Sequence, residues 1–139
     1  MGLMEDIGVY LSSNGQGAVG TAIFYGGRPD QPDDCLTLYE YSGPAPEMEN
    51  SEDAFAWERP SLQMVSRSAD PLAARNTIRA AWAPLVPLTN LWLTDDAGKK
   101  TLYREINPQQ SPFQLGRDEN RRFLWAVNFQ IIKRPRPEL

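Results

Sequence analysis

The stretch Phe123–Lys133 constrains the fold more than any other part of the chain. From position 123 to 131 its odd positions are all apolar, whereas polar Asn128 and Gln130 interrupt the even positions. Side chains of a β-strand alternate between its two faces, so this pattern predicts a strand with one face on a core. Pro135 and Pro137 follow, and neither can donate a hydrogen bond to a neighbouring strand. The strand is therefore expected to end before them.

The rest of the chain predicts a sheet with helices beside it. The polar stretch 116–120 indicates a loop before the last strand. Apolar spacing predicts a short helix over residues 3–11 and a second helix after Asp70–Pro71, where aspartate suits the N-cap. Period-two patterns predict strands over residues 21–25, 35–41, 61–68, 88–94 and 101–107. We predict an α+β fold, a mostly antiparallel sheet with two helices packed on one side, over a single domain 1–133 followed by a basic, proline-rich C-terminal tail 134–139.

Composition excludes several kinds of site. The chain has no histidine and a single cysteine, Cys35. Without imidazole there is no histidine-dependent triad, and the commonest general base and metal ligand are missing. Cys35 alone can form neither an internal disulfide nor a thiolate zinc cluster. We predict no enzyme activity, no cofactor and no metal site.

Hydropathy predicts no membrane contact. No run approaches the roughly 18 apolar residues that span a bilayer, and the first residues lack the basic start and apolar core of a secretion signal. We expect a protein made in the cytoplasm.

Charge is divided unevenly along the chain. Residues 1–53 hold ten acids against one base, a net charge of −9, whereas residues 54–139 hold thirteen bases against eight acids, a net charge of +5. In one interpretation the two parts neutralise each other within one fold. In the other, an acidic face of one copy meets a basic face of the next in a head-to-tail assembly.

Some local patterns invite a catalytic or nucleotide-binding interpretation. Asp95–Asp96, or Glu58, could act as acid/base groups, but the glycine that follows the aspartates favours a hairpin turn. The loop 26–33 contains two glycines, but it lacks the Gly-Lys-Ser/Thr signature and its acids would repel phosphate. We therefore favour a turn and an irregular loop.

Four separated segments together carry a recognisable pattern. They are residues 27–33 with 38–43, residues 58–64, the helix after Asp70, and residues 110–120 with the last strand. In their order and spacing they resemble the phage minor capsid or tail-terminator (neck) protein family of long-tailed phages.

The resemblance implies a structural virion protein of the tail and neck, made in the host cytoplasm. Such a protein caps the tail tube and joins it to the head-neck connector as a homo-oligomeric ring, typically a hexamer, around the DNA channel. The implied partners are further copies of itself, the major tail-tube protein, the head-completion or stopper protein, and DNA that passes without sequence-specific binding. The alternatives are another neck protein, such as a head-completion or stopper subunit, or a non-viral binding module.

Three charged groups are the candidate contact residues. The first is expected to face the channel or a neighbour, the second to contact adjacent subunits, and the third to reach the tail or connector. A solvated surface without a role is the alternative for the first two groups and a frayed chain end for the third. The groups are Glu47, Glu49, Glu52 and Asp53; Arg117, Arg121 and Arg122; and Lys133, Arg134 and Arg136.

Overall fold

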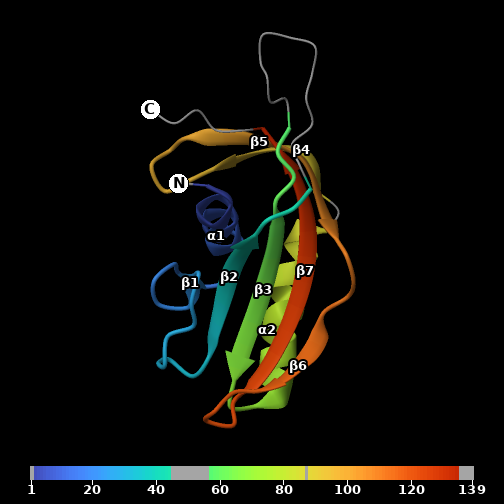
Figure 1. Ribbon diagram of the computed structural model, residues 1–139. Helices are drawn as coiled ribbons and strands as arrows, with labels where there is room; N and C mark the ends of the chain where they lie inside the picture. The colour runs from blue at the N-terminus through green and yellow to red at the C-terminus, as the bar shows by residue number, and fades with distance from the viewer. Residues whose placement is uncertain (1, 45–56, 87, 135–139) are drawn as a thin grey trace.

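The computed structural model describes residues 2–44, 57–86 and 88–134. Its elements form one seven-stranded sheet and two α-helices, with a short 3-10 turn after the second helix (Figure 1). In chain order they are α1 (Leu3–Ser13), β1 (Ile23–Tyr25), β2 (Cys35–Tyr41), β3 (Ser61–Ser68), α2 (Pro71–Trp82), η1 (Ala83–Leu85), β4 (Leu88–Thr94), β5 (Lys100–Pro108), β6 (Phe113–Arg117) and β7 (Phe123–Lys133).

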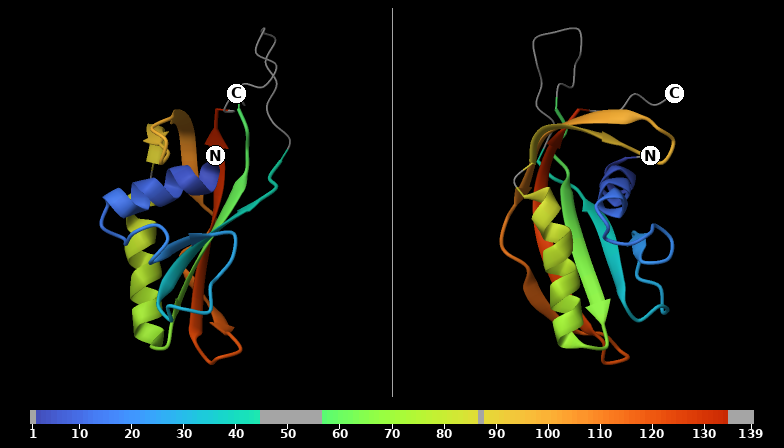
Figure 2. Two further views of the ribbon diagram at one scale, coloured as in Figure 1. Left: turned by 90° about the vertical axis from the view of Figure 1, so that its left-hand side faces the viewer. Right: turned by 180° about the vertical axis from the view of Figure 1, so that it is seen from behind.

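The strand order is β1-β2-β3-β7-β5-β4, and β6 also pairs with β7. Only β1 and β2 are parallel; every other pair of strands is antiparallel. Both helices lie on the same face of the sheet, as the edge-on view shows, and the β4–β5 hairpin curls over α1 (Figure 2). The predicted α+β fold with helices on one side is confirmed.

The long strand β7 lies at the centre of the sheet. On one side it pairs with β3 along the whole of that strand, and on the other side with β5 near its C-terminal end and β6 near its start. Val127, Phe129 and Ile131 are all fully buried in the main core, so the predicted alternation is confirmed. Those side chains point to the face that the helices cover.

Local sequence explains how the helices are placed. Asp70 caps α2, since its Oδ1 accepts a hydrogen bond from the Leu72 backbone N–H at 3.1 Å, and Pro71 occupies the first turn. Ala74 and Ile78, four residues apart, are fully buried against the sheet. On the first helix a buried pair holds α1 to β5, because the Tyr103 hydroxyl donates to Asp6 Oδ2 at 2.6 Å.

The segment before β7 differs from the expected loop. Residues 113–117 form β6, so the strand runs through Gly116 and Arg117, and only the next residues turn. The register shifts between Gln114 and Gly116, and Gly116 has φ +120°, a conformation that favours glycine. Because β5 covers only the C-terminal part of β7, β6 can pair with the remaining edge.

The helix-free face of the sheet is polar and aromatic. Across it, Tyr39 lies opposite Gln63, which lies opposite Asn128. The rings of Tyr39 and Tyr41 stack with their centroids 6.4 Å apart. Beneath them a second, smaller cluster contains Val65, Leu124 and Ala126. Neither helix covers this second cluster.

Candidate functional site

The sheet register separates the charged candidate residues into two groups. At one end of the sheet Tyr41 lies opposite Ser61 and Ser61 opposite Gln130, close to Trp57. At the other end Arg67 lies opposite Leu124, close to Arg122. We call these the Trp57 end and the Arg122 end.

At the Arg122 end, the guanidinium of Arg122 is held by three carboxylates. Its Nε lies 2.8 Å from Asp118 Oδ2, Nη1 lies 3.2 Å from Asp33 Oδ1, and Nη2 lies 3.3 Å from Asp30 Oδ1. The Arg122 side chain is only 7% exposed. It also donates to the Asp30 backbone carbonyl. A planar guanidinium with five N–H donors suits such a site, where one group joins several acceptors.

A second buried arginine holds the same loop. Arg67 Nε donates to the Asp33 carbonyl at 3.1 Å, and its Nη2 donates to the Pro32 carbonyl at 2.6 Å. Arg67 is 3% exposed. The two arginines therefore tie the irregular loop between β1 and β2 to the sheet.

These contacts divide the predicted arginine group. Arg122 pairs with carboxylates of its own subunit and so stabilises the fold. Little of its side chain is exposed for contact with a neighbouring subunit. Arg117 is exposed and lies over the Phe123 ring, with its guanidinium carbon 4.4 Å from the ring centroid. Arg121 is exposed and has φ 61°. Of the three arginines, Arg117 and Arg121 present their charge to the surface.

The same contacts bear on the uneven charge of the chain. Asp30 and Asp33 come from the acidic first part, whereas Arg122 comes from the basic second part. Their pairing neutralises some of the segregated charge within the fold. The interpretation of internal neutralisation therefore holds at the Arg122 end.

The pKa of the Asp118 carboxyl is lowered by its place in the Arg122 cluster. Burial would by itself raise its pKa, but hydrogen bonds from the Arg122 backbone and guanidinium and from the Asn120 backbone outweigh burial and lower the pKa below 3.8. A carboxyl with a lowered folded-state pKa stabilises the fold above its unfolded-state pKa, and this stabilisation is lost as the pH falls through the folded-state value.

We expect Asp118→Asn to destabilise the protein at neutral pH and much less in acid. Urea unfolding at about pH 7 and about pH 3 measures the difference in free energy of unfolding between wild type and variant. That difference should shrink at the lower pH, because the wild-type carboxyl is then becoming protonated. An equal difference at both pH values would show that the ionised Asp118 carboxylate contributes nothing to the free energy of unfolding.

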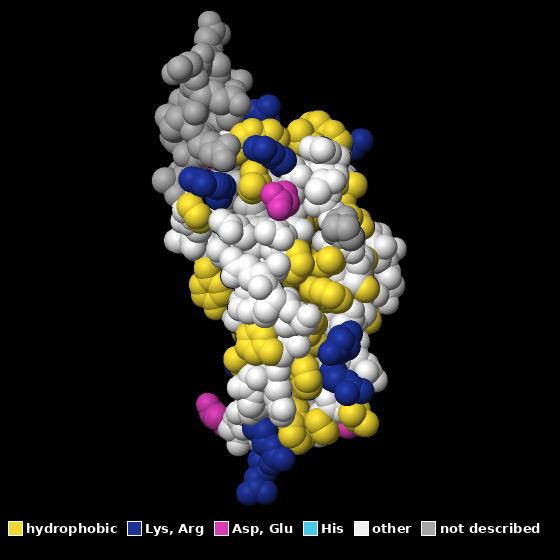
Figure 3. All heavy atoms as spheres, turned by 90° about the vertical axis from the view of Figure 1, so that its right-hand side faces the viewer, with side chains coloured by type: hydrophobic (Ala, Val, Ile, Leu, Met, Phe, Trp, Pro, Cys, Tyr) yellow, Lys and Arg dark blue, Asp and Glu magenta, His cyan; other side chains and the backbone are white. Residues whose placement is uncertain are grey.

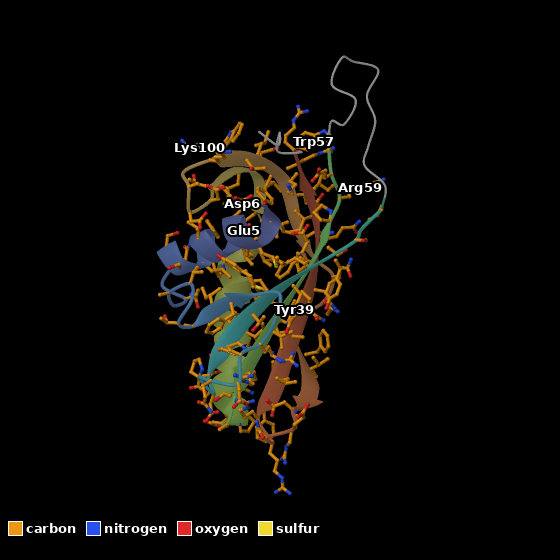
Figure 4. All side chains as sticks on the ribbon, turned by 60° about the vertical axis from the view of Figure 1, so that its left-hand side comes forward. Glu5, Asp6, Tyr39, Trp57, Arg59 and Lys100 are labelled. Atoms are coloured by element: carbon orange, nitrogen blue, oxygen red, sulfur yellow. The ribbon has the colours of Figure 1, made fainter. Side chains whose placement is uncertain are left out.

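At the Trp57 end, two cationic groups lie over one aromatic ring. The guanidinium carbon of Arg134 lies 4.5 Å from the centroid of the Trp57 ring, and that of Arg104 lies 5.6 Å from it. Both distances are within the range of cation–π attraction. Figure 4 shows Trp57 and Arg59 together near the upper end of the sheet, well away from Tyr39.

The residues next to Trp57 join the end of β7. Backbone hydrogen bonds run in both directions between Glu58 and Lys133, at 2.7 and 3.0 Å, and Lys133 Nζ lies 3.3 Å from Glu58 Oε2. The Lys133 side chain is 6% exposed, so it belongs to the sheet. Arg134 continues the pairing, since its N–H donates to the Leu102 carbonyl. Lys133, predicted to end the domain, and Arg134, predicted to begin the tail, are thus both hydrogen-bonded to the fold.

Several predicted contact residues lie outside the described residues. They are Glu47, Glu49, Glu52, Asp53 and Arg136. The structure nevertheless describes the residues from which those segments leave the fold. Gly43 lies so close to Arg59 that a side chain at position 43 would clash with the Arg59 carbonyl oxygen. The acidic segment and the basic tail thus start from the same end of the sheet, which sequence patterns alone did not indicate.

The residues considered for acid/base chemistry have structural roles. Asp95 Oδ1 accepts from the backbone N–H groups of Ala97 and Lys99, each at 2.9 Å, which confirms the predicted turn. Glu58 pairs with Lys133, as described above. Cys35 is 3% exposed. In the described segments no three acidic or cysteine side chains are arranged to hold a metal ion. None of the helices there is long and apolar enough to cross a membrane.

Comparison with known proteins identifies the family. A family model described as bacteriophage tail terminator protein matches residues 10–134. A solved structure that is 12% identical in sequence aligns with 94% of this chain and 89% of its own length, with a TM-score of 0.53, and at that identity it supports the fold alone. No curated protein matches the sequence. Because the family model spans most of the chain, including both ends of the sheet, this protein belongs to the bacteriophage tail terminator family.

Proposed function

We propose that this tail protein caps the tail tube and joins it to the head-neck connector as a homo-oligomeric ring around the DNA channel. Six copies is the expected number. The observation that carries the proposal is the family match over residues 10–134. The role is structural, without a catalytic step, and the partners are the major tail-tube protein and a head-completion or stopper protein.

The two ends of the sheet support different contacts in such an assembly. A ring closes through heterologous interfaces, in which two different patches of one subunit meet the complementary patches of its neighbours. Arg117 and Arg121 present positive charge at the Arg122 end, where Arg122 itself is internally paired. We propose that Arg117 and Arg121 contact an adjacent subunit.

The Trp57 end suits contact along the tail axis. Trp57, Arg104 and Arg134 form a stacked group there, and aromatic and arginine side chains are enriched among residues that dominate binding energy. Arg136, the remaining predicted tail or connector contact, follows Arg134 in the sequence. We propose that this end meets the tail tube or the connector.

The DNA channel needs walls that do not hold phosphate. Each lysine or arginine contact with phosphate adds affinity through counterion release and would slow passage. The proposed channel- or neighbour-facing residues, Glu47, Glu49, Glu52 and Asp53, carry the opposite sign. DNA would therefore pass without sequence-specific binding.

The test is to mix the purified protein with isolated tail tubes and image the tube ends by electron microscopy. We expect annuli at the tube ends and a loss of further tube growth. Arg117→Glu with Arg121→Glu should remove the annuli while the circular dichroism spectrum is unchanged. Lys99→Glu with Lys100→Glu makes the same change in net charge in the β4–β5 turn and should cap normally. Wild-type protein that neither forms annuli nor stops growth would contradict the proposed function.

A further inference from the structure

The outer face of α2 carries charge that no acidic group in the described part of the chain balances. Arg75 and Arg79 are exposed and four residues apart, so they lie next to each other on the helix. Like charges at this spacing destabilise a helix, and the whole stretch 71–94 contains no aspartate or glutamate. Among residues 2–44, 57–86 and 88–134, no acidic group forms an ion pair with either arginine.

An exposed apolar residue and small residues complete this face. Leu72 precedes Arg75 by three residues and is 56% exposed, although it lies in the first turn of a helix whose opposite side is fully buried. Asn76 and Ala80 lie between and beside the arginines and are also exposed. Figure 3 shows lysine and arginine side chains gathered on the flank of the molecule where α2 lies. The outer face of α2 thus offers two cations beside apolar surface.

The chain itself contains a segment of complementary chemistry. Glu47, Glu49, Glu52 and Asp53 are close together in the sequence, and no lysine or arginine lies between Arg28 and Arg59. Met48 and Phe55 supply apolar side chains within the same stretch. An acidic segment with interspersed apolar residues matches a basic face beside an exposed leucine.

Chain geometry favours docking between copies. The described residues on either side of 45–56 both lie at the Trp57 end, where Gly43 packs against the Arg59 backbone. A stretch of that length anchored there at both ends can reach at most about 20 Å. The first turn of α2 follows the far end of β3, and β3 spans about 26 Å. Figures 1 and 2 show α2 starting at the end of the sheet where β3 ends. Leu72, in the first turn of α2, is therefore beyond the reach of the same copy's segment.

We propose that residues 47–53 of one copy dock on the outer face of α2 of a second copy, through Arg75, Arg79 and Leu72. The contact joins two different patches, as a closed ring requires. It deepens the proposed function, since it rests on the ring and names the surfaces that would form it.

The first test separates binding from folding. Arg75→Glu alone places a glutamate four residues before Arg79, an arrangement that stabilises a helix, while it removes the net positive charge of the face. We expect unchanged or slightly increased thermal stability and association weakened by about tenfold or more in sedimentation velocity at low salt. Arg75→Glu with Arg79→Glu should abolish association. Lys99→Glu with Lys100→Glu, the charge-matched control, should associate as wild type does.

The second test uses charge exchange between copies. One variant carries Arg75→Glu with Arg79→Glu, and the other carries Glu47→Lys, Glu49→Lys, Glu52→Lys and Asp53→Lys. Each alone should remain monomeric, and an equal mixture should associate, because each reversed patch then meets its opposite. A chain that carries all six substitutions should also associate.

The outcomes are distinguishable. Association of the α2 double variant at wild-type strength would overturn the inference and leave the proposed function standing. Rescue by the six-substitution chain but not by the mixture would mean docking within one copy, which also overturns it. Annuli that form normally but no longer bind tube ends would assign the face to the tube protein instead. Failure of wild-type protein to form annuli at all would count against the proposed function itself.

Discussion

Replacing Arg122 with glutamate is expected to lower the midpoint of thermal unfolding by about 10 °C or more, because it puts a carboxylate at a largely covered position beside Asp118, whose side chain is 12% exposed. The variant would leave Asp118, Asp30 and Asp33 without their shared cation and would add a fourth carboxylate among them. The loop that the two buried arginines hold should detach from the sheet. Circular dichroism during heating measures the midpoint.

The neighbouring arginines provide the matched control. Arg117→Glu with Arg121→Glu should shift the midpoint by no more than about 2 °C, since both side chains are exposed. Arg122→Lys keeps the charge but cannot reach several acceptors in one plane, so an intermediate midpoint is expected. If Arg122→Glu unfolds at the wild-type temperature, the cluster does not hold the loop, and Arg122 becomes available again as a subunit contact.

Replacing Phe129 with alanine is expected to lower the free energy of unfolding by about 3–5 kcal/mol, the usual cost of removing a fully buried phenylalanine. Phe129 is 0% exposed and lies near the middle of the sheet, opposite Leu62 on β3 and Pro108 on β5. The cavity would open where three strands meet the helical layer, and rigid strands on both sides limit its collapse. Urea unfolding should show a lower midpoint with an unchanged slope.

A neighbour on β7 controls for changes in the strand itself. Gln130 is the next residue along β7, and its half-buried side chain points to the helix-free face. Gln130→Ala should change the free energy of unfolding by no more than about 0.5 kcal/mol. A loss of less than about 1 kcal/mol for Phe129→Ala would mean that the core rearranges to fill the space. It would also weaken the view that the odd positions of β7 organise the domain.

The two ends of the sheet now have distinct chemistry. The Arg122 end is an internally balanced ion cluster that fixes a loop, with Arg117 and Arg121 exposed beside it. The Trp57 end holds stacked aromatic and cationic groups and is the point from which two charged segments leave. For a family whose members act in tail assembly, this polarity offers different surfaces to different neighbours.

Much of the fold could be predicted because its signals are local. The alternation in β7 reports its buried face, since side chains of a strand project alternately whatever the strand pairs with. The cap of Asp70 and the turn at Asp95 depend on hydrogen bonds that span two to four residues. The helix of residues 71–82 and the strand of residues 35–41 followed from the same kind of short-range pattern.

The sequence by itself therefore determined every α-helix and strand except β6, the buried face of β7 and the exclusion of histidine-based chemistry. Only the tertiary structure decided which distant groups meet: the Arg122 guanidinium meets the Asp30 carboxylate across 92 positions, and Arg67 donates to the Asp33 backbone carbonyl across 34. The same holds for β6, whose pairing depends on the edge of β7 that β5 leaves uncovered, and for the meeting of Glu58 with Lys133. Local periodicity does not predict such long-range contacts, because they form only when distant strands come together in register.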